Sequence, residues 1–209
     1  FYKFDLVFTV FGPAYFCLSP GKWLTGFAQP WIIYLDNEIY QSSGWLQKCK
    51  LWLKFFLQAR FFCRSDKLVV ELDHVKQGLV SRRLARPEDV FVVHNCVSSI
   101  YFKPELWQEV QLAKNGQKFS IGFVGRDYSH KNVSILIEVK KLLVSHGVDV
   151  DFYVTLTEAE WSARTDEFRS LLHNVGMLAV AECPSFYRQM DAVIFPSLLE
   201  CFSATPLEA

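Results

Sequence analysis

Apolar runs of strand length alternate with helical stretches along the first half of the chain. A run of four to eight apolar residues between turn signals predicts a buried strand, and longer stretches of helical composition predict helices. The expected order is a strand at 4–11, a helix at 44–64, a strand at 67–72, a helix at 73–83 and a strand at 90–95. Asp73 is expected to cap the second helix. A further apolar stretch follows Pro30.

The second half repeats this alternation after a more polar stretch. Strands are expected at 119–124, 148–154, 177–180 and 191–197, and helices at 132–147, 158–176 and 185–190. Strands that alternate with helices at this spacing predict parallel sheets covered on both faces, so the fold class is α/β.

The polar stretch at 98–118 contains Pro104 and Gly116 and has no strand pattern, which is typical of a domain junction. We therefore expect one unit at 1–104, a linker or hinge at 105–118 and a second unit at 119–209. The chain starts at Phe1 and ends in a helical pattern without a stop signal, so both units are expected to be incomplete.

Composition narrows the classes of partner. The 22 basic and 22 acidic residues cancel, so no overall field favours nucleic acid. The six cysteines form no C-x-x-C pair and do not cluster with histidine, so neither a metal site nor a disulfide framework is expected. The longest early apolar run is broken at Gly12-Pro13 and is too short to span a bilayer. Because the cysteines are expected to be free thiols of a reducing compartment, we expect a cytoplasmic location.

The stretch "GFVGRDYSHKN" places Gly125, Arg126 and Lys131 directly after an expected strand. Ligands of doubly wound sheets bind at the carboxyl ends of strands, and a helix starting near Asn132 would direct its amides to the same place. Two cations and a helix N-terminus suit a diphosphate. The alternative is a solvated loop that carries two surface charges.

The stretch "FPSLLECFSATPLEA" carries a second group of candidates. Seven residues separate Glu200 from Glu208, and Thr205-Pro206 are expected to open a helix with Thr205 as its cap. A carboxylate there can accept hydrogen bonds from the two vicinal hydroxyls of a ribose. The alternative for Glu208 is a favourable interaction with the helix dipole alone.

Together, Gly-Arg-x4-Lys-Asn, three α/β steps and Pro-Ser-x2-Glu-x7-Glu resemble the retaining glycosyltransferases of the GT-B fold, family 4 or "group 1" type. The resemblance is specific over residues 119–209. In the first half, "VVHNCVSSIYFKP" is similar to the family's crossover between its two Rossmann-like domains, with matches at Asn95, Phe102 and Pro104.

The resemblance implies roles for individual residues. Arg126 and Lys131 would hold the diphosphate of a nucleotide-sugar donor, Glu208 the ribose, and Glu200 would face the donor sugar near the anomeric carbon. The rest of the implied donor site is Gly125, Met177, Leu178, Cys201, Phe202 and Ser203. Tyr187 and Asp191 match family positions that are expected to be structural.

The implied activity is retaining transfer of a hexosyl group from a nucleotide-diphosphate sugar to an acceptor hydroxyl. The acceptor would be a carbohydrate or a lipid-linked molecule in cell-surface polysaccharide or glycolipid assembly, and no metal or other cofactor is expected. One alternative is another GT-B enzyme, such as an epimerase or phosphorylase. The other is a non-catalytic sugar-nucleotide or carbohydrate-binding module, because Cys201 and Ser203 stand where the family usually has glycine.

The stretch at 44–64 combines basic residues with many aromatic ones and contains no acid. Its basic residues are Lys48, Lys50, Lys54, Arg60 and Arg64. One interpretation is peripheral contact with the inner, anionic face of a membrane. The other is the ordinary packing of a half-buried helix.

Overall fold

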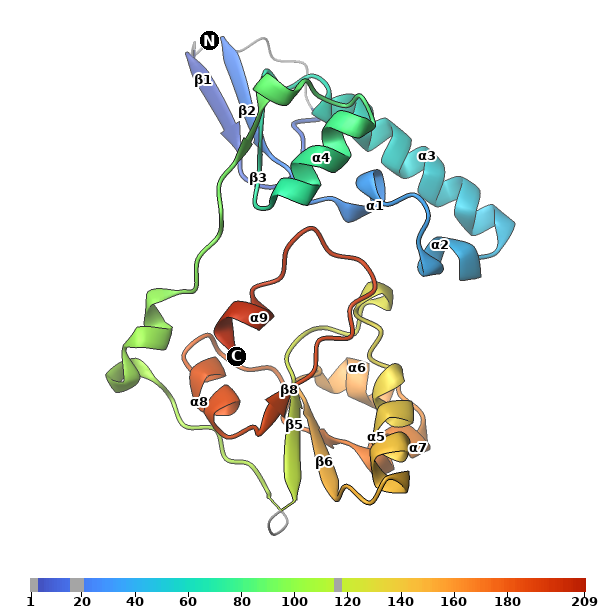
Figure 1. Cartoon of the computed structure of the whole chain (residues 1–209), viewed down its shortest axis with the longest axis vertical. Helices are drawn as coiled ribbons and strands as arrows, with labels where there is room; N and C mark the ends of the chain where they lie inside the picture. Colours follow the sequence, from blue (N-terminus) through green and yellow to red (C-terminus); the bar gives the residue numbers. More distant parts are fainter. Residues whose placement is uncertain (1–3, 16–20, 115–117) are drawn as a thin grey trace. The chain divides into compact units, whose positions relative to one another are not determined.

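The protein is described from a computed structural model that covers residues 4–15, 21–114 and 118–209. It divides into two compact units (Figure 1). Unit 1 comprises Phe1–Asn95 and Leu199–Ser203, and unit 2 comprises Cys96–Leu198 and Ala204–Ala209. The expected linker at 105–118 includes residues 115–117, which lie outside the described residues, and its boundaries stay a prediction.

Unit 1 contains a parallel sheet with the strand order β1-β2-β3-β4. The strands are β1 (Leu6–Thr9), β2 (Lys22–Gly26), β3 (Lys67–Val70) and β4 (Val90–Val92). The helices are α1 (Pro30–Ile33), α2 (Glu38–Ser42), α3 (Trp45–Phe62) and α4 (Asp73–Ser81). The strands and helices expected in the first half are therefore confirmed, except that Leu72, and not Asp73, is the N-cap of α4.

The sequence pattern missed β2. Its residues, Lys-Trp-Leu-Thr-Gly, include two polar residues and a glycine, so they form no apolar run. Neighbouring elements hold this strand instead. The Trp23 amide donates to Asp66 Oδ2 at 2.7 Å, and Thr25 Oγ1 accepts hydrogen bonds from Thr9 at 2.9 Å and Ser65 at 2.7 Å.

The core of unit 1 lies between its sheet and its helices, with α3 and α4 on the same side of the sheet in Figure 1. Leu68 and Val70 of β3 pack there with Phe55 and Phe62 of α3 and Leu79 of α4. Apolar residues at alternate positions of a strand thus meet the apolar positions of two helices.

Unit 2 contains a second parallel sheet with the strand order β7-β6-β5-β8. The strands are β5 (Phe119–Phe123), β6 (Val150–Val154), β7 (His173–Asn174) and β8 (Ala192–Val193). The helices are α5 (Ile135–Ser145), α6 (Glu158–Ser162), α7 (Asp166–Leu171), α8 (Cys183–Arg188) and α9 (Thr205–Glu208). Helices α5 to α7 lie on one side of this sheet and α8 lies on the other (Figure 1).

Both faces of the unit 2 sheet are buried, as the sequence predicted. Phe152 of β6 packs in the cluster that includes Leu136 and Phe168, whereas the next residue, Tyr153, packs with Phe186 on the opposite side. All five residues of β6 are buried, which is typical of a central strand in a doubly wound sheet.

The sequence prediction was wrong between 158 and 180. The expected single helix is interrupted because the Thr165 side chain accepts a hydrogen bond from the Phe168 amide and caps a separate helix, α7. The strand falls at His173–Asn174 and not at 177–180. Gly176, with φ 85°, turns the chain out of the sheet, so the following apolar residues lie in a loop.

Candidate functional site

The strand order of unit 2 defines where a ligand is expected to bind. Along the chain, β6 and β7 are added on one side of β5, and β8 is added on its other side. The topological switch point therefore lies between the carboxyl ends of β5 and β8, where open α/β sheets bind their ligands. The loop that follows β5 contains the predicted phosphate-binding residues, Arg126 and Lys131.

Gly125 begins the loop after β5. Its amide donates to Thr155 Oγ1 at 3.1 Å, which ties the loop to the end of β6. A Cβ atom at this position would lie 3.1 Å from the Phe123 ring, so a side chain would push this ring or the loop aside. A small residue is therefore required here for close packing.

Arg126 is held in place by Glu160. Its Nε donates to Glu160 Oε1 at 2.8 Å, and the guanidinium lies 5.9 Å from the centroid of the Tyr128 ring. Glu160 also accepts from the Asp127 amide at 3.2 Å. The sequence prediction did not include Glu160, although Thr157-x-x-Glu160 is a capping-box pattern and the structure contains that box.

The hydrogen bonds to Glu160 keep it ionised. Partial burial acts against this, but hydrogen bonds from the Thr157 amide, the Arg126 guanidinium and the Thr157 hydroxyl lower the pKa of Glu160 to about 2. Asp127, the next residue, forms a second ion pair, in which the Arg164 guanidinium donates hydrogen bonds to both of its carboxylate oxygens. Two side chains from the segment after β6 thus fix the loop that carries Arg126.

Lys131 lies where the loops after β5 and β8 meet. It ends a short 3-10 helix, Ser129–Lys131, and its Nζ lies 5.4 Å from the centroid of the Phe195 ring. The Leu198 amide donates to the His130 carbonyl at 2.8 Å, which joins the two loops directly. Gly125, Arg126 and Lys131 are therefore brought to the switch point by one well-anchored loop.

The helix after this loop starts later than predicted. Asn132 has left-handed dihedrals, φ 52° and ψ 38°, and α5 begins at Ile135. The left-handed residue separates the 3-10 helix that carries Lys131 from the α-helix. Lys131 and the first amides of α5 thus belong to different helices, and α5 does not start at Asn132, where the sequence predicted its start.

Glu208 lies in the first turn of α9, as predicted, but Ala204 and not Thr205 is the N-cap. The pKa values of Tyr101 and Tyr187 lie above the ordinary tyrosine value. Burial is the larger cause, and the nearby negative charge of Glu208 is the second. Both phenols therefore stay protonated beside the Glu208 carboxylate. Sequence reasoning treated Tyr187 as structural and did not relate Tyr101 to this site.

The remaining predicted residues have different surroundings. Met177 is 65% exposed in the loop after β7, and Leu178 packs against the cluster of Tyr153, Phe186 and Tyr187. Asp191 fixes β8 beside β5, because the Ser120 amide donates to its Oδ2 at 2.7 Å.

Glu200, Cys201, Phe202 and Ser203 belong to the segment that groups with unit 1. Cys201 is 6% exposed and packs with that unit's apolar core. Burial is the main cause, and the negative charges of Glu200 and Glu71 are a smaller one, of a Cys201 thiol pKa raised to about 12. The thiol is therefore protonated at neutral pH. A protonated, buried thiol is a poor nucleophile.

The described residues contain neither a metal-binding cluster nor a membrane-spanning helix. They contain no group of three or more His, Cys, Asp or Glu side chains placed to hold a metal ion. Among their helices, none has both the length and the apolar character required to cross a membrane.

Comparisons of the sequence identify glycosyltransferases. No protein-family model matches the chain. The capsular polysaccharide biosynthesis glycosyltransferase CapM of Staphylococcus aureus is 25% identical over 206 residues, which cover 91% of this chain and 54% of that protein. The D-inositol 3-phosphate glycosyltransferase of Arthrobacter sp. (strain FB24) is 31% identical over 117 residues, or 52% of this chain and 27% of that protein. The chain thus spans about half the length, or less, of these relatives.

Comparisons of the structure identify the same class. Sucrose-phosphate synthase of Thermosynechococcus elongatus superposes with a TM-score of 0.63 at 14% identity, over 91% of this chain and 48% of that one. The pneumococcal O-GlcNAc transferase GtfA, solved in complex with UDP and GlcNAc, gives 0.52 at 14% identity, over 90% and 35%. The fold is that of GT-B glycosyltransferases, with two Rossmann-like units. The curated relatives are glycosyltransferases as well, so the predicted resemblance is confirmed at that level.

Proposed function

We propose that the protein is a retaining glycosyltransferase of the family 4 type, which moves a hexosyl group from a nucleotide-diphosphate sugar to an acceptor hydroxyl. The observation that carries this proposal is the loop after β5, which brings Arg126 and Lys131 to the switch point of the unit 2 sheet. The sequence relatives support the same class of reaction. The complex of GtfA with UDP supports a nucleotide donor.

In this proposal the two cations stabilise the leaving group. Negative charge develops on the diphosphate as the glycosidic bond breaks, and fixed cations that meet it lower the activation barrier. Among the described residues, the Arg126 side chain is hydrogen-bonded only through Nε, to Glu160, so its two Nη groups can bind phosphate oxygens. The leaving phosphate takes the proton of the acceptor hydroxyl, and Glu200 orients the donor sugar.

The nucleoside end of the donor is assigned to Glu208. Its carboxylate would accept hydrogen bonds from the ribose hydroxyls, while the protonated phenols of Tyr101 and Tyr187 lie beside it. Met177 and Leu178 would contact the base. Gly125, Cys201, Phe202 and Ser203 complete the proposed donor site.

The setting of the reaction is also a proposal. We assign the enzyme to the cytoplasmic side of the cell, in polysaccharide or glycolipid assembly, with a carbohydrate or lipid-linked acceptor and without a metal. The name of the CapM relative supports this choice of pathway. Contact of the segment 44–64 with the inner face of the membrane would place the enzyme near lipid-linked acceptors.

Release of nucleoside diphosphate tests the proposal. The protein is incubated with UDP-, GDP- and ADP-sugars, and the free diphosphate is measured with and without candidate acceptors. We expect release that depends on an acceptor. NMR of the product should show the same anomeric configuration as in the donor. Saturable donor binding without release under any of these conditions would instead favour the non-catalytic binding module.

A further inference from the structure

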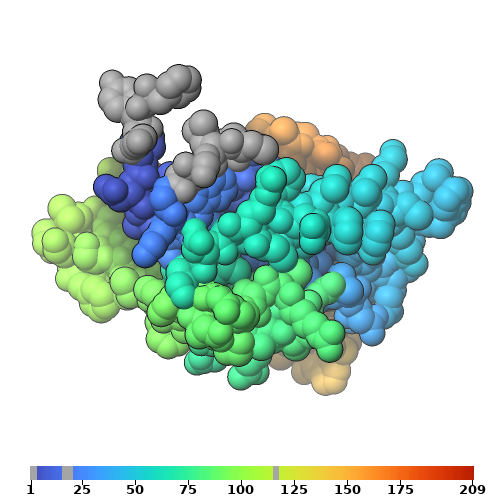
Figure 2. Space-filling model, turned by 90° about the horizontal axis from the view of Figure 1, so that it is seen from above, coloured from blue at the N-terminus to red at the C-terminus, as the bar shows by residue number. Residues whose placement is uncertain are grey.

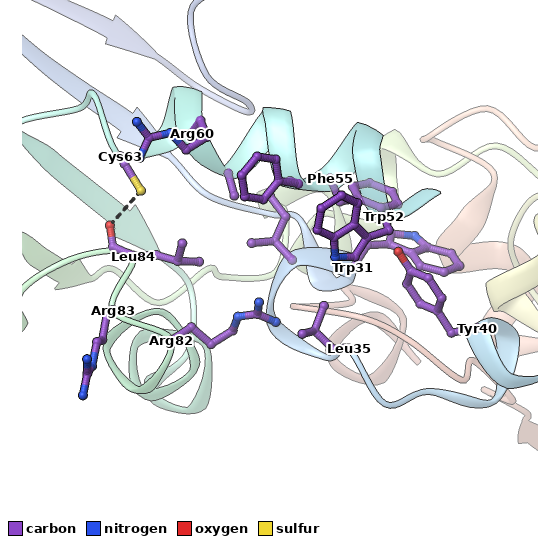
Figure 3. A pocket seen from close by; sticks show the side chains of 13 residues that line it. Trp31, Leu35, Tyr40, Trp52, Phe55, Arg60, Cys63, Arg82, Arg83 and Leu84 are labelled. Atoms are coloured by element: carbon purple, nitrogen blue, oxygen red, sulfur yellow. Dashed lines mark hydrogen bonds between the residues drawn. The ribbon is translucent and has the colours of Figure 1, made fainter. Parts of the chain in front are cut away.

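Unit 1 contains a cavity of about 250 Å³ that the proposed glycosyl transfer does not use (Figure 3). It lies among α1, α3 and the residues that follow α4. Its lining includes Trp31, Leu35, Tyr40, Trp52, Phe55 and Arg82. The volume lies just below the range of about 300 to 1,000 Å³ that is typical of small-molecule sites, so the occupant must be small or must extend out of the cavity.

One wall of the cavity is aromatic and closely packed. Trp31 stacks on Phe55 with ring centroids 5.4 Å apart and an interplanar angle of 4°, and Tyr40 meets Trp31 edge-on at 5.6 Å. Trp52 stacks on Phe56 at 5.2 Å. Mutually stacked rings hold each other in place, so this wall is a preformed apolar surface.

The polar side-chain groups that line the cavity are almost all hydrogen-bond donors. Those directed towards it are the Arg82 guanidinium, the indole N–H groups, the Tyr40 hydroxyl and the Cys63 thiol, which donates to the Leu84 carbonyl at 3.4 Å. The described residues of the lining include no carboxylate and no side-chain amide. A ligand whose polar end only accepts hydrogen bonds fits this set, whereas the hydroxyls of a sugar would lack acceptors.

Two of these donors, the Arg82 guanidinium and the Tyr40 hydroxyl, have no hydrogen-bond partner among the described residues. Figure 3 shows the Arg82 guanidinium turned into the cavity towards Leu35, while the Arg60 and Arg83 side chains turn away. Among the described residues, the Arg82 guanidinium makes no hydrogen bond or ion pair. The Tyr40 hydroxyl is shielded from solvent without a hydrogen bond there, and burial raises its pKa, so it stays protonated. A guanidinium that faces the cavity without a partner among the described residues can bind an anionic ligand oxygen through charge-assisted hydrogen bonds.

The opening of the cavity is apolar and lies in a basic region. Trp52 and Phe56 line the cavity and are also 56% and 49% exposed on α3, which lies at the surface of unit 1 (Figure 2). Helix α3 carries Lys48, Lys50, Lys54 and Arg60 and no acidic residue. A chain that leaves the cavity thus meets further apolar surface, and its charged end meets a positive field.

We propose that this cavity binds a single aliphatic chain that carries an anionic head group, a carboxylate or a phosphate. The chain lies along the aromatic wall of Trp31, Phe55 and Trp52, and Arg82 binds the anion. The inference does not depend on the glycosyl transfer, because all of the residues involved belong to unit 1 and none belongs to the proposed donor site.

Calorimetric titration of the 209-residue chain tests the proposal with decanoate, decyl phosphate and decan-1-ol, all kept below their aggregation concentrations. We expect one saturable site with at least tenfold tighter binding of an anion than of the alcohol. Comparing the two anions identifies the preferred head group. In a hexanoate, octanoate and decanoate series, each added methylene should tighten binding about fourfold until the chain outgrows the apolar surface.

Two variants separate the head group from the chain. Arg82→Gln should weaken decanoate binding at least tenfold and leave decan-1-ol unchanged, whereas Arg83→Gln, whose side chain turns away, is the matched control and should change neither. Trp52→Ser, at a half-exposed wall position, should weaken both ligands. Circular dichroism checks that each variant is folded.

Three results would overturn the proposal. They are no saturable binding to the folded chain, equal affinity for the anion and the alcohol, and an Arg82→Gln variant that binds decanoate as the unmodified chain does. Anionic vesicles test the other interpretation, in which α3 contacts a lipid surface and the cavity binds no ligand. Sedimentation with vesicles that does not depend on Arg82, together with no decanoate binding, would show that α3 adsorbs to a lipid surface and that the cavity is not a site.

Discussion

Glu160 is the residue on which the geometry of the Arg126 loop depends. It closes the capping box of α6 and binds both the guanidinium of Arg126 and the amide of Asp127. Its pKa of about 2 is below the ordinary value of 4.5, so its ionised form stabilises the folded state. This contribution is complete above about pH 4.5 and is lost as the pH falls towards 2.

Glu160→Gln should therefore lower the free energy of unfolding by on the order of 1 kcal/mol near neutral pH, because the amide keeps the shape but loses the charge. Urea denaturation of both proteins from about pH 6 to about pH 3 should show the difference shrinking with falling pH. Glu158→Gln removes a carboxylate from the same turn without touching Arg126 and should have a smaller effect. A difference that widens on acidification would contradict the role of Glu160.

Glu208 is predicted to recognise the ribose of the donor. Glu208→Gln should weaken the binding of a nucleoside diphosphate about tenfold, because a hydrogen bond to a charged group contributes about 1.5–3 kcal/mol. Binding of inorganic pyrophosphate should stay unchanged, since it has no ribose. Calorimetric titration with both ligands measures this, and an equal loss for both would exclude the ribose role.

At the scale of elements, local hydrogen bonds decided where the sequence prediction failed. Helix α5 and strand β6 have long, regular apolar patterns and were predicted well. The segment 158–176 also has helical periodicity, but Thr165 accepts from the Phe168 amide and starts a new helix. Strand β2 has no apolar run, and contacts with Asp66 and Thr9 from distant parts of the chain establish it.

Thr165→Ala should lower the free energy of unfolding of the chain by about 1 kcal/mol, because the Phe168 amide at the start of α7 loses its partner. Thr165→Ser keeps the hydroxyl and should restore most of the stability. Urea denaturation followed by circular dichroism measures both variants. Equal stability of the alanine variant and the unmodified chain would show that the interruption of the helix has another cause.

At the scale of the whole molecule, the order of strands and helices was sufficient to predict two parallel α/β units. It also predicted that the loop after β5 would carry the cations, because ligand sites of such sheets follow the carboxyl ends of strands. The order could not predict Glu160 as the partner of Arg126, since 34 positions separate them and only the folded unit brings them together. For the same reason the phenol of Tyr101 beside Glu208 was not foreseen.

The central claim is that Arg126 and Lys131 bind the diphosphate of a nucleotide donor. Calorimetric titration of the chain with UDP, GDP, ADP and pyrophosphate tests it most directly, with the Arg126→Ala/Lys131→Ala double variant beside the unmodified protein. The matched control is Lys141→Ala/Arg188→Ala, which removes two cations from exposed ion pairs of the same unit. Circular dichroism confirms that all three proteins are folded.

The account predicts that the unmodified chain and the control bind one nucleoside diphosphate in preference to the others, and that the double variant binds it at least tenfold more weakly. Charge-assisted hydrogen bonds of about 1.5–3 kcal/mol each are sufficient for this loss. A folded double variant that binds the same nucleotide as tightly as the unmodified chain would contradict the assignment of the donor site.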